Sequence, residues 1–391
     1  MIKKPVVLFL PKWYPNKFDP FNGNFIENHA LAISEKTDVC VLFVQSDETT
    51  KQDYLIQVKK IKNLLEVRCY FKKPKTGFSY LDKIITAIRY FKAQKKAFRH
   101  IQENYHRNFD LTHIHVLSRT APFAVWLKKK KKIPFGITEH WSGYTKESNV
   151  FKGYFRKKFY RYIAKESGGI TCVSNYLKEA MENHGIQSSY SIIPNVVDTN
   201  LFQIKNHQSN QFIRIVHISN LSKTPKNIHL IVEALNKVGS IRDDFEVDFI
   251  GAGPDQDFML AELQNSSIKN RFRFHGEIEL KKVAEILKNA DFLLLYSQFE
   301  TQSVVMIEAF ASGVPVLASN VGGIPEYMSK ERGILVPPNS KEELEKGLIQ
   351  MLSNIKNYDP KKLREYAINN FSIERIQKQF LSFYNQIQSN G

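Results

Sequence analysis

Two glutamates have the residue type and spacing that suggest chemistry most directly in this chain. Glu300 and Glu308 lie eight residues apart, and a spacing of eight on a helix returns two side chains to one face. A carboxylate at such a place can accept hydrogen bonds from a diol such as a ribose, as in dinucleotide-binding folds. The spacing alone is a weak motif, because two solvated glutamates on a helical face would look the same. The surrounding sequence has to decide between the two interpretations.

The sequence around these glutamates predicts a strand, a loop, a helix and a second strand. The short apolar run Asp291–Tyr296 is typical of a buried parallel strand, which places Glu300 in the loop that follows. Residues Val304–Ser312 have helical spacing that stops at Gly313, and Val314–Ala318 is predicted to be the next strand. Ligands of an open α/β sheet bind beyond the carboxyl ends of its strands. The two glutamates are therefore expected at a ligand-binding edge.

The predicted start of this helix also offers groups for a phosphate. Backbone N–H groups at a helix N-terminus have no partner within the helix and attract anions. We expect the amides of Ser303, Val304 and Val305 to bind phosphate, while Glu308, a turn and a half into the helix, accepts hydrogen bonds from a ribose.

Three neighbouring motifs carry a resemblance to a known family. The segments Glu300–Glu308 and Ala309–Val316 and the turn Gly322–Glu326 together resemble glycosyltransferase family 4, the glycosyl transferases group 1. This family of retaining enzymes with the GT-B fold includes sucrose-phosphate synthases and mannosyltransferases. The resemblance covers nearly the whole chain and is weakest over Ser46–Arg107, where acceptor recognition varies in the family. It implies that Glu300 holds hydroxyls of the transferred sugar.

Two series of apolar runs alternate with helical patterns and predict an α/β fold with two Rossmann-like domains. The length of 391 residues also exceeds what one hydrophobic core usually supports. The predicted strands of the first half are Val6–Leu10, Val39–Val44, Leu111–Val116, Phe135–Thr138 and Ile170–Val173. Those of the second half are Ile213–Ile218, Phe245–Ile250, Arg271–Phe274, Phe292–Tyr296 and Val314–Ala318. The resemblance implies that the two domains face each other across a cleft.

The domain boundaries follow from a hinge and a terminal helix. The segment Ile192–Asp198 resembles the junction signature of the family, with Val196 in place of the usual glycine, and leads into the polar stretch Gln203–Gln211. We expect an acceptor-binding domain over 1–198 and a nucleotide-sugar-binding domain over 199–370. Residues 371–391 contain the amphipathic segment Ile373–Ile387, which the resemblance implies is a helix that returns to the first domain.

In the first domain the resemblance points to a glycine and a histidine. Gly23 matches a glycine loop that lies by the donor phosphates and the acceptor. His140 follows a predicted strand, at the place of the active-site histidine that contacts the transferred sugar. His113 and His115 share one strand face and are interpreted as structural or as lining the cleft, because no cysteine or carboxylate stands near them at a metal-site spacing.

In the second domain the resemblance points to a clamp for the donor. Lys226 matches a lysine that binds the donor diphosphate, whereas Asn220 stands in place of the usual arginine and adds no charge; Lys223 is a candidate to compensate. Gly251 matches a Gly-x-Gly-Pro turn that lets the chain approach a ligand closely. Gly276 and Glu277 resemble a loop whose backbone faces the nucleotide base.

The formal charge of +17 lies entirely in the first half of the chain. Residues 1–200 contain 34 Lys and Arg against 17 Asp and Glu, whereas residues 201–391 contain 22 of each. The basic segments are Lys83–Arg99, Lys128–Lys132 and Phe151–Tyr162, the last with interleaved aromatic residues. This asymmetry favours adsorption to an anionic membrane surface, with a solvated basic face as the alternative. Nucleic-acid binding is disfavoured, because no zinc-finger or RNP-like motif accompanies the charge.

The resemblance therefore implies a glycosyltransferase that moves a sugar from a UDP- or GDP-sugar to a lipid-linked or saccharide acceptor in cell-surface polysaccharide synthesis. Neither a metal nor a cofactor is expected. The widely spaced Cys40, Cys69 and Cys172 fit a reducing compartment, and the apolar run at the N-terminus is too short for a signal peptide or a membrane span. We expect a cytoplasmic protein on the inner face of the cell membrane. The alternatives are a non-catalytic nucleotide-sugar-binding paralogue or scaffold and a nucleotide-sugar epimerase of the same fold.

Overall fold

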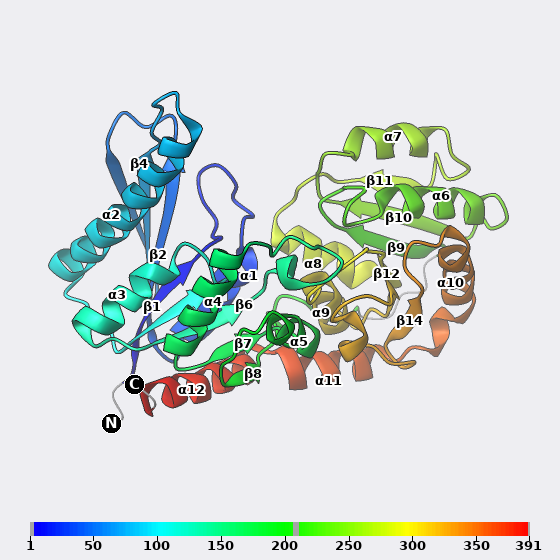
Figure 1. Ribbon diagram of the computed structural model, residues 1–391. Coiled ribbons are helices and arrows are strands. Elements are labelled where there is room, and N and C mark those ends of the chain that lie inside the picture. Colours follow the sequence, from blue (N-terminus) through cyan, green and yellow to red (C-terminus); the bar gives the residue numbers. More distant parts are fainter. Residues whose placement is uncertain (1–3, 206–210, 390–391) are drawn as a thin grey trace. The chain divides into compact units, whose positions relative to one another are not determined.

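The computed structural model describes residues 4–205 and 211–389, and the chain divides into two compact units (Figure 1). One unit comprises Met1–Val196 and Ile376–Gly391, and the other comprises Val197–Arg375. These boundaries lie two and five residues from those expected from the sequence. The Val197 amide donates to the Phe371 carbonyl at 2.9 Å, and Val197 bridges to Ser372. These residues all belong to the second unit, so both passages of the chain between the units begin inside that unit. Residues 206–210 of the polar stretch predicted after the hinge lie outside the described residues.

The first unit is built on an eight-stranded sheet with the order β3-β4-β2-β1-β5-β6-β7-β8. Its strands are β1 (Val6–Pro11), β2 (Asp38–Asp47), β3 (Tyr54–Ile61), β4 (Leu64–Lys72), β5 (Leu111–His115), β6 (Phe135–Glu139), β7 (Ile170–Cys172) and β8 (Tyr190–Ile192). The pairing of β3 with β4 is antiparallel and every other pairing is parallel. The five predicted strands are present, but β3, β4 and β8 were not predicted.

Helices connect the parallel strands of this unit. They are α1 (Asn24–Ser34), α2 (Ser79–Tyr105), α3 (Ala121–Lys131), α4 (Tyr154–Glu166) and α5 (Asn175–Asn183), with a short 3-10 turn at Ser142–Tyr144. Central strands such as β5 are buried along their whole length, as expected for a parallel sheet covered on both faces. Their carboxyl ends, and the loops that follow, form the edge where Gly23 and His140 lie.

The second unit is a six-stranded parallel sheet with the order β11-β10-β9-β12-β13-β14. Its strands are β9 (Ile213–Ile218), β10 (Phe245–Ile250), β11 (Phe272–Phe274), β12 (Phe292–Leu295), β13 (Val316–Ser319) and β14 (Gly333–Val336). Its helices are α6 (Ile228–Gly239), α7 (Gln256–Gln264), α8 (Leu280–Asn289), α9 (Val304–Ala311), α10 (Lys341–Asn354) and α11 (Pro360–Phe371), with 3-10 turns at Ile324–Tyr327 and Ile355–Asn357. The strand order reverses between β9 and β12, so this is a doubly wound sheet with its binding edge at that point.

The last helix, α12 (Ile373–Ser389), packs on the sheet of the first unit (Figure 1). Its apolar face buries Phe380, Phe383, Tyr384 and Ile387. The Tyr384 hydroxyl lies 2.9 Å from Nδ1 of His113 on β5. Residues 271 positions apart in the sequence thus share one core.

The three cysteines are buried free thiols. None of the helices in residues 4–205 and 211–389 combines the length and apolarity needed to cross a bilayer.

The packing of α12 gives a first prediction. A Cβ added at Gly136 on β6 would lie 2.3 Å from Cδ1 of Ile387 and 2.7 Å from the ring of Phe383. Gly136→Ala should therefore lower the free energy of unfolding by about 1–3 kcal/mol, the usual cost of overpacking a core. Urea unfolding measures this. Adding Ile387→Val, which removes the nearest atom, should recover part of the loss; equal stability of wild type and Gly136→Ala would contradict the packing described.

Candidate functional site

An ion pair joins the two residues that the sequence suggested for the reaction centre of the second unit. Nζ of Lys226 donates to Oε1 of Glu300 at 2.5 Å, and the Ser297 hydroxyl donates to the same oxygen at 2.9 Å. The two charged side chains are only 21% and 13% exposed. Partial burial makes the attraction between them stronger than at an open surface.

Backbone and amide contacts hold the two loops of this pair together. The loop after β9 carries Lys226, and the loop after β12 carries Glu300. The Gln298 amide donates to the Pro225 carbonyl at 2.7 Å, and its side chain donates to the Asn227 side chain at 2.7 Å. Gly322, with a φ of +55°, approaches so closely that a Cβ there would lie 1.9 Å from the Glu300 carbonyl oxygen. The glycine turn after β13 therefore also fixes Glu300.

Glu308 is a buried carboxylate in the second turn of α9. Glu308 is only 6% exposed, and its carboxylate forms no hydrogen bond or ion pair with any described residue. Burial raises the pKa of this carboxyl from 4.5 to about 7. A buried carboxylate without a partner is costly, so a ligand with hydroxyl donors would restore the interactions that the protein lacks. Ser303, the N-cap of α9, and Val304, its first residue, lie at the start of the same helix.

Backbone hydrogen bonds bring together the predicted nucleotide-binding turns. The Gly251 amide donates to the Gly276 carbonyl at 2.8 Å. Gly251 has a φ of +117°, and a Cβ there would lie 1.9 Å from the carbonyl oxygen of Ser219, which directly precedes Asn220. Asn220 and Glu277 are exposed. The turns after β9, β10 and β11 thus meet at one edge of the sheet.

Lys223, the candidate to replace the arginine charge missing at Asn220, lies over an aromatic ring. Nζ of Lys223 lies 3.9 Å from the ring centre of Phe258 on α7. A cation over an aromatic face is stabilised there but is still able to pair with an anion, so Lys223 remains a candidate to compensate. Lys226 is the clamp residue whose charge lies beside Glu300.

In the first unit a buried carboxylate presents His140. Both oxygens of Glu139 accept hydrogen bonds, from the amides of His140 and Trp141 at 2.9 Å and from Leu117 at 3.0 Å. His140 follows β6 and lies against the ring of Phe25 at the start of α1, with 4.7 Å between ring centres. The sequence predicted that His140 follows a strand, but it did not indicate the role of Glu139, because a glutamate at the end of a strand is usually exposed to solvent.

Gly23 is required by its surroundings. It has a φ of +68°, and a Cβ there would lie 2.5 Å from the backbone of Trp13. Gly23 caps α1, the helix that lies against His140. The glycine thus positions this part of the first unit.

A group of cations and tryptophans near β1 was not identified from the sequence. Nζ of Lys12 lies 4.4 Å from the ring centre of Trp13 and 4.8 Å from that of Trp141, which also contacts Arg156. Burial lowers the pKa of Lys12; the Glu139 carboxylate opposes this, and Arg156 and Arg119 lower it further. Among the described residues, none of these three cations forms an ion pair within 4 Å. They remain available to an anionic ligand.

Each half of the chain matches the model of a known protein family. Residues 39–201 match the family described as Glycosyltransferase Family 4, and residues 198–370 match Glycosyl transferases group 1. The chain is 30% identical to N-acetyl-alpha-D-glucosaminyl L-malate synthase of Bacillus anthracis, over 57% of this chain and 61% of that protein. It is 26% identical to the putative teichuronic acid biosynthesis glycosyltransferase TuaC of Bacillus subtilis, over 69% of this chain and 67% of that protein. The matches leave 39% of the first relative and 33% of the second uncovered.

The fold is that of solved GT-B proteins. The structure of sucrose-phosphate synthase from Thermosynechococcus elongatus superposes with a TM-score of 0.75 at 17% identity and covers 100% of both chains. The predicted fold class, two parallel-sheet α/β domains with a terminal helix on the first, is confirmed.

The buried Glu308 gives a second prediction, for the ligand-free protein. Because its pKa is about 7 when folded and 4.5 when unfolded, ionisation destabilises the folded state. The resulting loss of unfolding free energy grows as the pH rises from about 4.5 to 7 and is about 3 kcal/mol above that. Glu308→Gln removes this loss. As the pH rises from 5 to 8, the unfolding free energy of the variant should therefore increase by about 2–3 kcal/mol relative to that of wild type, measured by urea unfolding.

The matched control is Glu365→Gln, which alters an exposed carboxylate on α11. It should leave the pH dependence of unfolding as in wild type. If Glu308→Gln follows the wild-type curve as well, Glu308 is not the buried, partnerless group described above.

Proposed function

This chain belongs to glycosyltransferase family 4, the glycosyl transferases group 1, and we propose that it transfers a sugar from a UDP- or GDP-sugar to an acceptor. The observation that carries the proposal is Glu308, a buried carboxylate with no partner among the described residues, in the same helix whose N-terminus follows Glu300. A ribose supplies the two hydroxyl donors that such a carboxylate lacks.

The donor diphosphate binds between a cation and a helix start. Lys226 provides the charge, and the amides of Ser303 and Val304 at the start of α9 provide further donors. Arrival of the diphosphate draws Lys226 away from Glu300, and Glu300 then accepts hydrogen bonds from the hydroxyls of the sugar. This arrangement neutralises the leaving diphosphate without a metal or a cofactor.

The reaction retains the anomeric configuration. A phosphate oxygen of the donor takes the proton of the acceptor hydroxyl on the face from which the diphosphate departs, so no nucleophile of the protein is needed. His140 contacts the transferred sugar. The contact between Lys226 and the departing phosphate tightens while negative charge builds on that phosphate. Lys226 therefore stabilises the transition state more than the bound donor.

The acceptor is an anionic, lipid-linked or polysaccharide molecule used in the synthesis of a cell-surface polysaccharide such as lipopolysaccharide, capsule or exopolysaccharide. The unpaired cations Lys12, Arg119 and Arg156 favour a phosphate or carboxylate on that acceptor. The name of the relative TuaC, a teichuronic acid biosynthesis glycosyltransferase, supports the same class of product.

The protein acts at the cytoplasmic face of the membrane and binds anionic lipid through α4. On this helix Tyr154 and Phe155 are 72% and 84% exposed, next to the cations Lys157 and Lys158. Exposed aromatic side chains among cations are typical of surfaces that insert at a bilayer interface. The lysine run at the end of α3 is partly engaged elsewhere, since Lys128 donates to the Glu166 carbonyl at 2.8 Å. The aromatic face of α4 is therefore the stronger candidate.

The function is tested with a panel of UDP- and GDP-sugars, by measuring release of the nucleoside diphosphate with and without acceptor. Lys226→Met keeps the length of the side chain and removes its charge, so kcat should fall about 10²- to 10³-fold, the usual effect of losing a transition-state donor, with a smaller change in KM. Lys237→Met, an exposed lysine on α6, is the control and should behave as wild type.

Other outcomes distinguish the alternatives. An unchanged kcat in Lys226→Met would remove that residue from the reaction. Binding of a donor without turnover would indicate a non-catalytic nucleotide-sugar-binding protein, consistent with Asn220 in place of arginine. Inversion at C2 of the donor sugar would indicate an epimerase.

Membrane binding is tested by sedimentation with vesicles of phosphatidylglycerol and phosphatidylcholine. Lys157→Gln with Lys158→Gln removes two surface cations, each worth about 1 kcal/mol, so binding should weaken about 30-fold. Wild-type binding should also fall as salt is added. Lys281→Gln with Lys282→Gln on α8 removes the same charge from the second unit and should have little effect. No wild-type binding at low salt would contradict the membrane surface.

A further inference from the structure

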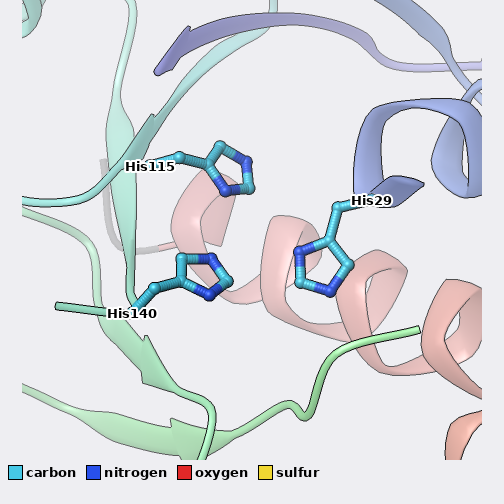
Figure 2. Close-up of side chains that lie close together, drawn as sticks. All are labelled: His29, His115 and His140. Carbon is cyan, nitrogen blue, oxygen red and sulfur yellow. The ribbon is translucent and has the colours of Figure 1, made fainter. Parts of the chain in front are cut away.

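Three histidines from distant parts of the sequence meet inside the first unit. His29 lies on α1, His115 ends β5 and His140 follows β6 (Figure 2). One ring nitrogen of each lies within 4.8 Å of those of the other two. Figure 2 shows the three rings turned toward a common space. All three residues are buried, and His140 is the most accessible at 7% exposure.

His115 differs from a neighbouring histidine in the hydrogen bonds of its ring. His113 lies two residues before His115 on the same strand, and both of its nitrogens are bonded, to Tyr384 at 2.9 Å and to Thr138 at 2.6 Å. Neither nitrogen of His115 has a hydrogen-bond partner in the described part of the chain. A buried polar atom left unpaired costs about 1–3 kcal/mol. The protein satisfies one histidine of β5 completely and leaves the other open toward His29 and His140.

The tautomer of His29 is fixed by its surroundings. Its Nε2 lies 3.3 Å from the Pro194 carbonyl oxygen, which can only accept, so Nε2 carries the proton. The lone pair is then on Nδ1, which is buried without a partner. A backbone carbonyl behind a metal-binding histidine has this same effect of fixing the tautomer.

We propose that His29, His115 and His140 form a binding site for a divalent transition metal of the zinc class. Imidazole nitrogen is a preferred ligand of zinc, copper, nickel and cobalt, whereas magnesium and calcium prefer oxygen. Three protein ligands with a fourth position for water are common in zinc sites. Zinc–nitrogen bonds of about 2.0–2.1 Å bring tetrahedral ligands to roughly 3.4 Å from one another. The ring nitrogens, which lie within 4.8 Å of one another, have to approach by up to about 1.4 Å to bind the ion.

The site has a consequence for sugar transfer, which rests on the proposed function. His140 is the residue proposed to contact the transferred sugar, and a metal that binds its ring withdraws it from that contact. Donor binding by Lys226 and α9 involves no metal. Occupation of the histidine site therefore inhibits the transferase rather than activating it.

Metal binding is tested on the full chain after removal of any histidine tag. Cobalt(II) serves as the probe, because histidine ligation in a four-coordinate site gives it strong visible absorption, and zinc is then added as a competitor. Wild type should bind one cobalt per chain, and zinc should displace it. His29→Phe keeps an aromatic ring against its neighbours and should weaken binding more than about 100-fold, beyond the 10- to 100-fold effect of losing an outer partner. His106→Ala, an exposed histidine, is the control.

His115→Gln is a second variant, in case His29→Phe does not fold; melting curves of all variants establish this. It should also lose the cobalt signal. Absence of a saturable cobalt signal in wild type, or its persistence in both folded variants, overturns the metal site. These outcomes do not depend on sugar transfer and so are separate from failure of the proposed function.

Zinc should lower the rate of sugar transfer by wild type, whereas the rate of transfer by folded His115→Gln should not change when zinc is added. If zinc binds but transfer continues unchanged, or increases, the inhibitory role is overturned. A wild type that binds cobalt but releases no nucleoside diphosphate from any donor contradicts the proposed function and supports the metal site.

Discussion

The contact between Lys226 and Glu300 is the constraint on which the second unit's site depends. Two opposite charges neutralise each other at 2.5 Å, and Gln298 and Gly322 hold their loops in place. Such a partly buried pair adds little net stability, because desolvation offsets most of the attraction. Its importance is positional: each charge keeps the other at the binding edge, and a diphosphate can replace Glu300 as the partner of Lys226 without exposing an uncompensated cation.

Glu308 and the histidine cluster illustrate a second property of these sites. The carboxylate of Glu308 and the ring nitrogens of His115 are buried and have no hydrogen-bond partner among the described residues. Stability would favour apolar residues at these positions, and such local violations are expected where a protein binds something. The hydrogen bonds of His113 show that the fold is able to satisfy a buried imidazole on the same strand as His115.

The sequence predicted those features that depend on local patterns. Continuous apolar runs predicted five strands of each sheet but missed the buried β4 and the strand β14. The glycines at 23, 251 and 322 marked turns, and at each of them the structure shows a close approach to another backbone segment. The antiparallel β3 was missed because it buries no residue fully and contains two adjacent lysines, so it shows no apolar run. His29 and Lys12 were missed because neither lies near its partners in sequence. Periodicity locates an element, but it does not tell which side chains of distant elements meet. The roles of the predicted site residues remain predictions.

The path of the chain through α12 affects how the protein is made. Residues 376–389 belong to the unit that otherwise ends at Val196. They lie on a helix that brings Phe383 and Tyr384 to a sheet whose strands are all synthesised earlier. While the ribosome translates the second unit, that sheet lacks part of its apolar cover. Domains usually complete folding in the order of their synthesis, but here the second unit can finish before the first. An exposed sheet face during translation is a place where chaperones bind, and a nascent chain halted before residue 376 would retain it.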